Sequence, residues 1–247
     1  MAPVTEPVLN AAGLRLRFPG AATDTLEGFD LAVAAGEFIA LVGGSGVGKS
    51  TLLRVVAGLL SPDDGTVTLN SPTIAGQRRR AIVFQDGRLL PWRRLRGNSG
   101  FVLEGLGLSA AERRARIDDV LRLTRLGDYA DRYPNQLSGG QVQRAGIARA
   151  LAVRPDLLLM DEPFSAVDAI TRRALQDEML RIWRDTGTAI LFVTHDIQEA
   201  ALLAERVVVL SGQPARIVLD HRIDIPHAER RNSADLAPLI TRISEAL

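Results

Sequence analysis

The chain lacks cysteine, contains few aromatic residues and has no long apolar run. Only 4% of its 247 residues are aromatic, and none is cysteine. The absence of cysteine excludes disulfides, zinc–thiolate sites and cysteine nucleophiles, and it fits a reducing compartment. No apolar stretch approaches the roughly 18 residues that a membrane-spanning helix needs, and the first residues lack a secretory pattern. We therefore expect a cytoplasmic chain that does not itself cross a membrane.

An excess of positive charge is absent as well. The sequence holds 30 basic and 29 acidic side chains, for a net charge of +1. Proteins that bind nucleic acid through bulk electrostatics show a strong basic excess, so no nucleic-acid partner is expected and any phosphate must be bound by a local site. All the basic residues are arginine except one, Lys49. That single lysine needs an explanation of its own.

Short apolar runs rich in β-branched residues alternate with helical patterns. With 46% hydrophobic residues the chain can bury a sizeable core, and several runs are apolar throughout, as strands covered on both faces are. A parallel sheet covered by helices is the predicted core. Its expected strands are residues 38–42, 81–84, 157–160, 189–193 and 206–210.

Three smaller regions flank this core. Residues 9–18, 29–33 and 65–70 predict an antiparallel β-subdomain. Between Gln85 and Leu137 the strand pattern disappears, and a capping-box pattern begins a helix over 109–124, so this part is predicted to be a helical insertion. An amphipathic helix is expected to close the chain, with one apolar face formed by Leu236, Leu239, Ile240 and Ile243. Because neither a repeat nor a long linker is visible, residues 1–247 are predicted to form one domain, with a helical subdomain at approximately 86–155.

A glycine-rich segment joins the expected strand 38–42 to a helical stretch, 51–59. Glycines in this strand–loop–helix context let backbone N–H groups curl around an anion at a helix N-terminus, as in phosphate-binding P-loops. The alternative is a glycine-rich turn that caps an ordinary helix; the match of both spacing and context favours the P-loop. The predicted nucleotide contacts are Gly43, Gly44, Ser45, Gly46, Val47, Gly48, Lys49, Ser50 and Thr51.

Lys49 occupies the lysine position of this loop. A compact ammonium on a flexible stem reaches between the β- and γ-phosphates, whereas a guanidinium is planar, larger and demands bidentate geometry. Lys49 is therefore predicted not to be replaceable by arginine. In the same loop, Ser50 is expected to supply its hydroxyl to Mg²⁺ and Thr51 to reach the α-phosphate.

Two carboxylates end the expected strand 157–160. Asp161 is suited to hold Mg²⁺ through water, and Glu162 to accept a proton from an attacking water molecule. Taken alone, such a pair before Pro163 more often caps a turn. Together with a P-loop, it is predicted to belong to a nucleotide site.

Residues 137–141, Leu-Ser-Gly-Gly-Gln, open a predicted helix and resemble the signature of ATP-binding cassette (ABC) proteins. Other motifs of that family follow in order. Gln85 resembles the Q-loop glutamine, a Mg²⁺ or water contact; residues 165–168 resemble the D-loop; His195 resembles the catalytic switch histidine; and Phe18 resembles the aromatic residue that stacks on adenine. Without the resemblance, Phe18 would more often be a core residue and His195 a turn residue.

The resemblance implies an α/β ABC ATPase fold: a P-loop NTPase (RecA-like) parallel sheet core with an antiparallel β-subdomain and a helical insertion. It also implies ATP and Mg²⁺ as cofactors and a head-to-tail pair of two copies. A serine and two glycines at a helix start can face a phosphate at the positive end of the helix dipole. In the family, the signature serves the nucleotide on the second copy, and here it would do so through Ser138, Gly139, Gly140 and Gln141.

The lengths between motifs exclude some branches of the family. About 87 positions separate Ser50 from Leu137, too few for the coiled coil of chromosome-maintenance and DNA-repair ATPases, and a single P-loop disfavours twin-cassette translation factors. Segments 84–92, 161–172 and 193–200 are similar to the ATPase subunits of nitrate, alkanesulfonate and taurine importers, although Val167 stands where leucine is usual and Asn98-Ser99 where Asn-Val is common.

That similarity implies two integral-membrane permease subunits, a solute-binding protein reached indirectly, and a peripheral position on the cytoplasmic face of the inner membrane. It implies a small solute as cargo, an anion such as an alkanesulfonate, nitrate or taurine. Trp92 is predicted to lie on the surface that meets the permease, rather than in the core. Two alternatives remain: a soluble regulatory or DNA-associated cassette without a membrane partner, and a P-loop kinase, which would have no use for residues 137–141.

Overall fold

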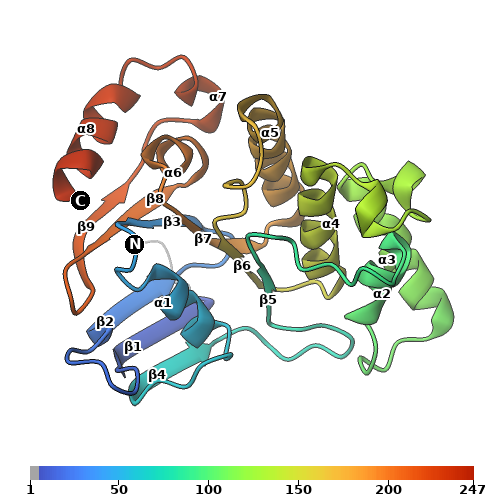
Figure 1. Cartoon of the computed structure of the whole chain (residues 1–247), viewed down its shortest axis with the longest axis horizontal. Coiled ribbons are helices and arrows are strands. Elements are labelled where there is room, and N and C mark those ends of the chain that lie inside the picture. The colour runs from blue at the N-terminus through green and yellow to red at the C-terminus, as the bar shows by residue number, and fades with distance from the viewer. Residues whose placement is uncertain (1–5) are drawn as a thin grey trace. The chain divides into compact units, whose positions relative to one another are not determined.

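The structure is a computed structural model that describes residues 6–247, and the chain divides into two compact units. The first unit joins the chain up to Asn70 with Ala189–Leu247, and the second is Ser71–Thr188 (Figure 1). The P-loop segment lies in the first unit and the signature segment in the second.

One sheet of the first unit is antiparallel. Its strands are β2 (Leu26–Val33), β1 (Leu9–Leu16) and β4 (Asp64–Leu69), in that order. In β1 and β2, buried residues such as Leu14 and Phe29 alternate with exposed ones, because one face of each strand packs inward. This sheet confirms the predicted antiparallel subdomain.

The other strands of this unit follow the order β7 (Ala189–Thr194), β3 (Phe38–Gly43), β8 (Arg206–Ser211) and β9 (Arg216–Arg222). β3 runs parallel to β7 and β8, and every residue of β3 and β7 is buried. This burial explains why their sequences are apolar throughout. β9 is antiparallel to β8 and was not expected from the sequence.

Among the residues that the structure describes, the helices of the first unit are α1 (Lys49–Val56), α6 (Ile197–Leu203), α7 (His227–Arg230) and α8 (Leu236–Ala246). α1 begins two residues earlier than predicted, because the P-loop passes directly into it. In α8, Leu236, Leu239 and Ile243 are buried as expected. Ile240 is only partly buried, so the apolar face is narrower than predicted.

The second unit contains the parallel pair β5 (Arg80–Val83) and β6 (Leu157–Asp161), with helices α2 (Leu95–Phe101), α3 (Ala110–Leu123), α4 (Gly139–Ala152) and α5 (Ala169–Thr186). Helices α2, α3 and α4 pack against one another (Figure 1). The Ser109 side chain accepts from the Glu112 N–H, and the Glu112 carboxylate accepts from the Ser109 N–H. This capping box confirms the predicted helix start.

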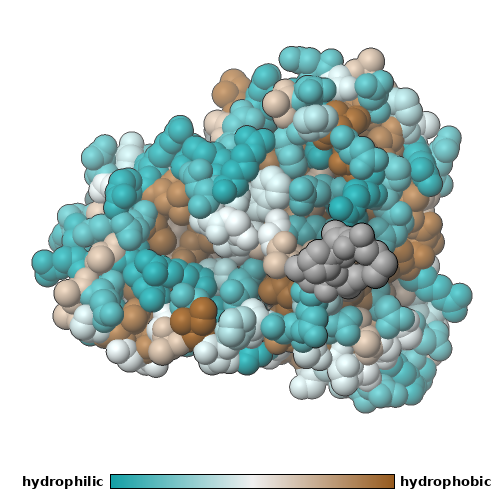
Figure 2. All heavy atoms as spheres, turned by 180° about the vertical axis from the view of Figure 1, so that it is seen from behind, coloured by the Kyte–Doolittle hydropathy of each residue, from teal (hydrophilic) through white to brown (hydrophobic). Residues whose placement is uncertain are grey.

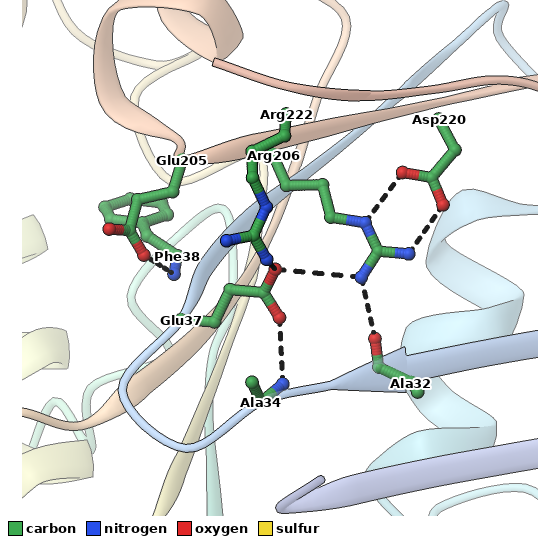
Figure 3. A network of polar contacts seen from close by, with 8 residues as sticks. All are labelled: Ala32, Ala34, Glu37, Phe38, Glu205, Arg206, Asp220 and Arg222. Atoms are coloured by element: carbon green, nitrogen blue, oxygen red, sulfur yellow. Dashed lines mark hydrogen bonds and ion pairs between the residues drawn. The ribbon is translucent and has the colours of Figure 1, made fainter. Parts of the chain in front are cut away.

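A network of charged residues fixes the start of β3 and β8, at the edge away from the P-loop (Figure 3). Arg206 donates to both carboxylate oxygens of Asp220, at 2.7 and 2.5 Å. The buried Glu37 accepts from the Ala34 N–H at 2.8 Å and lies 3.5 Å from the Arg222 guanidinium. These contacts link the start of β8, and the residue that precedes β3, to the end of β9.

The Asp220 pair makes stability depend on pH. Hydrogen bonds from Arg206 hold the pKa of the Asp220 carboxyl below its usual value. A lowered folded-state pKa stabilises the fold above the ordinary carboxyl pKa of about 4, and this contribution is lost as pH falls through the folded-state value. We expect Asp220→Asn to lower Tm at pH 7, with a difference that shrinks towards pH 3. Thermal melting of parent and variant measures this, with the exposed Asp128→Asn as control; a difference that grows in acid contradicts it.

No helix in residues 6–247 is both long enough and apolar enough to cross a bilayer. The face drawn in Figure 2 is mostly hydrophilic, and its hydrophobic side chains form small separate groups.

Candidate functional site

The P-loop follows β3 and ends in the first turn of α1. Gly46 and Gly48 adopt positive φ angles of 80° and 111°, in the region that favours glycine. A Cβ on Gly43 would lie 2.7 Å from the Leu210 carbonyl oxygen. The loop therefore needs glycine for its curvature and for its close approach to β8, which is what a backbone cradle for phosphate requires.

Lys49 lies against this cradle. Its side chain is 5% exposed, and Nζ donates to the carbonyl oxygens of Gly43 and Gly44 at 2.7 and 2.9 Å. Lys49, the single lysine of the sequence, thus directs its ammonium at the loop whose backbone amides are suited to phosphate. Ser50 and Thr51 follow in the first turn of α1 and are partly exposed.

His195 and Phe18 also belong to the first unit. β3 and β7 are neighbours, and Val42 pairs with Thr194, so the P-loop and His195 leave the sheet at adjacent strand ends. His195 is exposed. Phe18 lies beyond the end of β1 and is 41% exposed, as a residue that stacks on a ligand would be, rather than buried in the core.

Gln85 lies in the second unit, two residues after β5, and is exposed. The turn that follows packs on α4: the Arg149 guanidinium donates to the carbonyl oxygens of Gly87, at 2.8 Å, and Arg88. A Cβ on Gly146 would lie 3.2 Å from the Gly87 Cα. Arg149 therefore holds the Gln85 loop on the signature helix, a role that no motif predicted.

Asp161 ends β6 and Glu162 follows it, both partly buried. Glu162 has a φ of 44°, in the left-handed region that costs a non-glycine residue energy; Arg88, Arg125 and Arg154 adopt it as well. The Ser165 N–H and hydroxyl both donate to the Glu162 carbonyl, at 3.2 and 2.9 Å. These bonds fix the turn in which Glu162 leaves the strand.

The signature residues form the start of α4. Ser138 is the N-cap: its hydroxyl accepts from the Gln141 N–H, and the Gln141 side chain accepts from the Ser138 N–H at 2.9 Å. A Cβ on Gly140 would lie 2.6 Å from the Thr171 methyl group, so α4 closely approaches the first turn of α5. The glycine at 140 is thus required by this packing.

A second link joins α4 to α5 further along. Arg144 Nε lies 2.7 Å from the Glu178 carboxylate, and burial raises the pKa of Glu178. Asp168 caps the start of α5 by accepting from the N–H groups of Ile170 and Thr171. The signature and the D-loop-like segment are therefore held by two helices that contact each other at two points.

The predicted residues fall into two sets. The first unit carries Phe18, the P-loop residues and His195; the second carries Gln85, the signature, Asp161 and Glu162. Within each unit, the neighbouring strand ends gather part of the set. Arg149 was not predicted, because one arginine among many carries no local signal. The Asp168 cap was not predicted either, although aspartate is a common N-cap residue.

A glycine cradle between a buried parallel strand and a helix, with its lysine turned onto the loop, defines a P-loop NTPase. The model of the ABC transporter family matches residues 26–165. The chain therefore belongs to the ABC transporter family and is an ABC-type ATPase.

Proteins similar to this chain carry related names. It is 47% identical to the aliphatic sulfonates import ATP-binding protein SsuB of Mycobacterium sp. (strain MCS), over 92% of this chain and 89% of that protein. It is 39% identical to the taurine import ATP-binding protein TauB of Pseudomonas putida, over 94% and 88%. A solved dimeric ATP-binding cassette in a post-hydrolysis state, bound to ADP and Pi, is 27% identical, with a TM-score of 0.74, covering 88% of this chain and all of that one.

Proposed function

We propose that this chain powers the import of a small organic sulfonate, an alkanesulfonate or taurine, by hydrolysing ATP on the cytoplasmic face of the inner membrane. The observation that carries the proposal is its 39–47% identity, over nine-tenths of the chain, to ATP-binding proteins named for sulfonate and taurine import. A nitrate importer is the second candidate, since motifs 84–92 and 161–172 resemble that branch as well.

In this proposal the P-loop and Lys49 bind the phosphates of ATP, and Phe18 stacks on adenine. The residues fit a Mg²⁺ ion in donor chemistry, because Ser50, Gln85 and Asp161 offer oxygen ligands, which Mg²⁺ prefers. When bound, the ion neutralises the charge that develops on the phosphates. Glu162 accepts the proton of the attacking water molecule, and His195 contacts the γ-phosphate.

A second copy of the chain completes the site. The first-turn N–H groups of α4 and the positive end of its dipole suit an anion, while a phosphate bound by the P-loop is already held by its own copy. We infer that residues 138–141 of each copy contact the nucleotide of the other. The similarity to a dimeric ADP-bound cassette supports this arrangement.

The second unit offers a surface for a permease. A cavity of about 440 Å³ is lined by apolar residues, including Leu90 and Phe101, and by arginines such as Arg80 and Arg149. Trp92 stands two residues after Leu90 in the sequence. Its side chain is 70% exposed, which agrees with the predicted surface position. Aromatic side chains beside an apolar groove are the residues that carry most of the binding energy in many interfaces.

Growth of the host tests the cargo. Deleting the gene should abolish growth on an alkanesulfonate or taurine as sole sulfur source and spare growth on sulfate. Loss of growth on nitrate as sole nitrogen source, with sulfonate use intact, would favour the second candidate. A deletion strain that uses all of these compounds at the parent rate would refute both.

Trp92→Ala separates assembly from ATP binding. We expect the variant to fold and bind ATP, because its side chain leaves no cavity in the core, but to lose about tenfold or more in affinity for the permease. Thermal melting with and without MgATP, followed by co-purification of the permease subunits, measures both properties. Leu59→Ala, which removes an exposed apolar side chain from the first unit, is the control. Normal assembly and transport would remove Trp92 from the docking surface.

A further inference from the structure

Arg230 is a buried arginine in a segment that no motif covers. It lies at the end of α7 and is 2% exposed. Its Nη1 donates to the carbonyl oxygens of Ala201, at 3.2 Å, Leu202, at 3.3 Å, and Ala204. Its Nε donates to the Ile225 carbonyl at 2.8 Å. One guanidinium thus binds the C-terminal end of α6 through three carbonyl groups.

These hydrogen bonds offset the free-energy cost of burying the Arg230 guanidinium. Burial lowers the pKa of Arg230 to about 10, so the side chain remains protonated at neutral pH. The last carbonyl groups of a helix have no partner within the helix and carry the negative end of its dipole. Arg230 satisfies them from 26 or more positions along the chain. His227 adds a contact, from Nε2 to the Leu203 carbonyl at 2.9 Å.

The other end of α6 is fixed next to His195. The Asp196 carboxylate accepts from the N–H groups of Gln198 and Glu199, at 2.8 and 3.1 Å. The Thr194 hydroxyl donates to the buried Glu199 carboxylate at 2.9 Å and accepts from the Asp196 N–H at 3.0 Å. Both neighbours of His195 are therefore bonded to the first turn of α6.

Helix α6 is short enough to act as a rigid connection between its two ends. Its 7 residues make about two turns, or about 10 Å. Ala200, Ala201 and Leu203 are fully buried, and the helix packs on β3, β7 and α8. Figure 1 shows it beside the two helices that end the chain. Because a packed helix of this length moves as a unit, a shift at its C-terminal end is transmitted to its N-terminal end.

We propose that Arg230 is a positioning residue that sets the placement of His195 for ATP hydrolysis by fixing the C-terminal end of α6. The inference rests on the proposed function only in that His195 takes part in hydrolysis. All its contacts lie within the first unit. It assigns a role in the reaction to the C-terminal segment, outside the residues matched by the family model.

The test uses Arg230→Lys, which keeps the positive charge but replaces a planar fork of donors by one compact ammonium. His227→Ala, which removes only the second contact, is the milder variant, and Arg216→Lys on the exposed face of β9 is the control. The purified full chain is assayed for the Kd of ATP, for KM and kcat of hydrolysis, and for Tm.

A second readout follows the placement of His195 directly. The chain has three histidines, so carbethoxylation by diethylpyrocarbonate, measured by mass spectrometry, reports His195, His221 and His227 separately. For Arg230→Lys we expect kcat to fall about fivefold or more with Kd and KM within about twofold. The carbethoxylation rate of His195 should change at least about twofold, while that of His221 on β9 stays at the parent value.

Each contrary outcome has a distinct meaning. Parent values of kcat and of His195 reactivity in both variants would overturn the inference. A fall in Tm with all histidines more reactive would also overturn it, because Arg230 would then serve only global stability. His195→Ala is measured in parallel: if it hydrolyses ATP at the parent rate, the proposed role of His195 fails, and the reactivity data still show whether Arg230 positions that segment.

Discussion

Glu162→Gln is expected to reduce ATP hydrolysis by about 100-fold or more while ATP binding is retained. Glutamine keeps the shape of the side chain but cannot accept a proton, and a positioned general base contributes about 10²–10⁴ to the rate. The positive φ of Glu162 and the two bonds from Ser165 to its carbonyl fix where this side chain leaves the strand. Glutamine can adopt the same backbone, so the fold should be preserved.

The same variant should form a dimer that depends on ATP. If hydrolysis releases the two copies, a chain that binds ATP without hydrolysing it stays paired. Gel filtration with and without MgATP, together with a phosphate-release assay, measures both effects. Glu27→Gln, at an exposed position of β2, controls for the loss of one charge. Hydrolysis at the parent rate would exclude Glu162 as the base.

Lys49→Arg is the second substitution with a large expected effect, although it conserves charge. The Lys49 ammonium is buried and donates to the carbonyl oxygens of Gly43 and Gly44, and a larger, planar guanidinium does not reproduce the contacts of this compact donor. Hydrogen bonds to charged groups contribute about 1.5–3 kcal/mol each, so we expect affinity for ATP to fall about 10- to 100-fold. Isothermal titration of parent and variant measures the change.

Amine labelling tests the same contact without a substitution at Lys49. Lys49 carries the only side-chain amine of the chain, so bound MgATP should protect it from an amine-reactive reagent. Arg54→Lys introduces a reference amine at an exposed position of α1, whose labelling should not respond to the nucleotide. Equal labelling of Lys49 with and without saturating MgATP would falsify the phosphate contact.

The elements that were predicted correctly are those whose patterns involve residues close together in the sequence. The strands β3, β6, β7 and β8 were predicted because burial on both faces leaves an apolar run that needs no alternation. The start of α3 was predicted because a capping box is local. The P-loop was predicted because its glycines and lysine stand at fixed offsets along the chain. These candidate residues needed no knowledge of distant contacts.

Elements without such a local pattern were missed. In β9, exposed residues alternate with partly buried ones, and polar residues stand at both ends of the strand. It forms a strand because it pairs with β8. Helical patterns were expected between the strands, but no bounds were predicted for the 18-residue helix α5, although Asp168 caps it. The apolar face of α8 was overestimated at Ile240, because the sequence shows which side chains are apolar but not how far the neighbouring elements cover them.

The sequence by itself determined the class of protein, since each motif is a short run whose chemistry is fixed by spacing. Only the tertiary structure singled out the arginines that hold these motifs in place. Arg149 reaches a carbonyl 62 positions away, and Arg230 reaches carbonyls 26 to 29 positions away. Among 30 basic residues neither has a distinguishing neighbour in sequence. Folding brings each one to backbone carbonyls of a distant segment, and that pairing depends on the packing of distant segments rather than on local sequence.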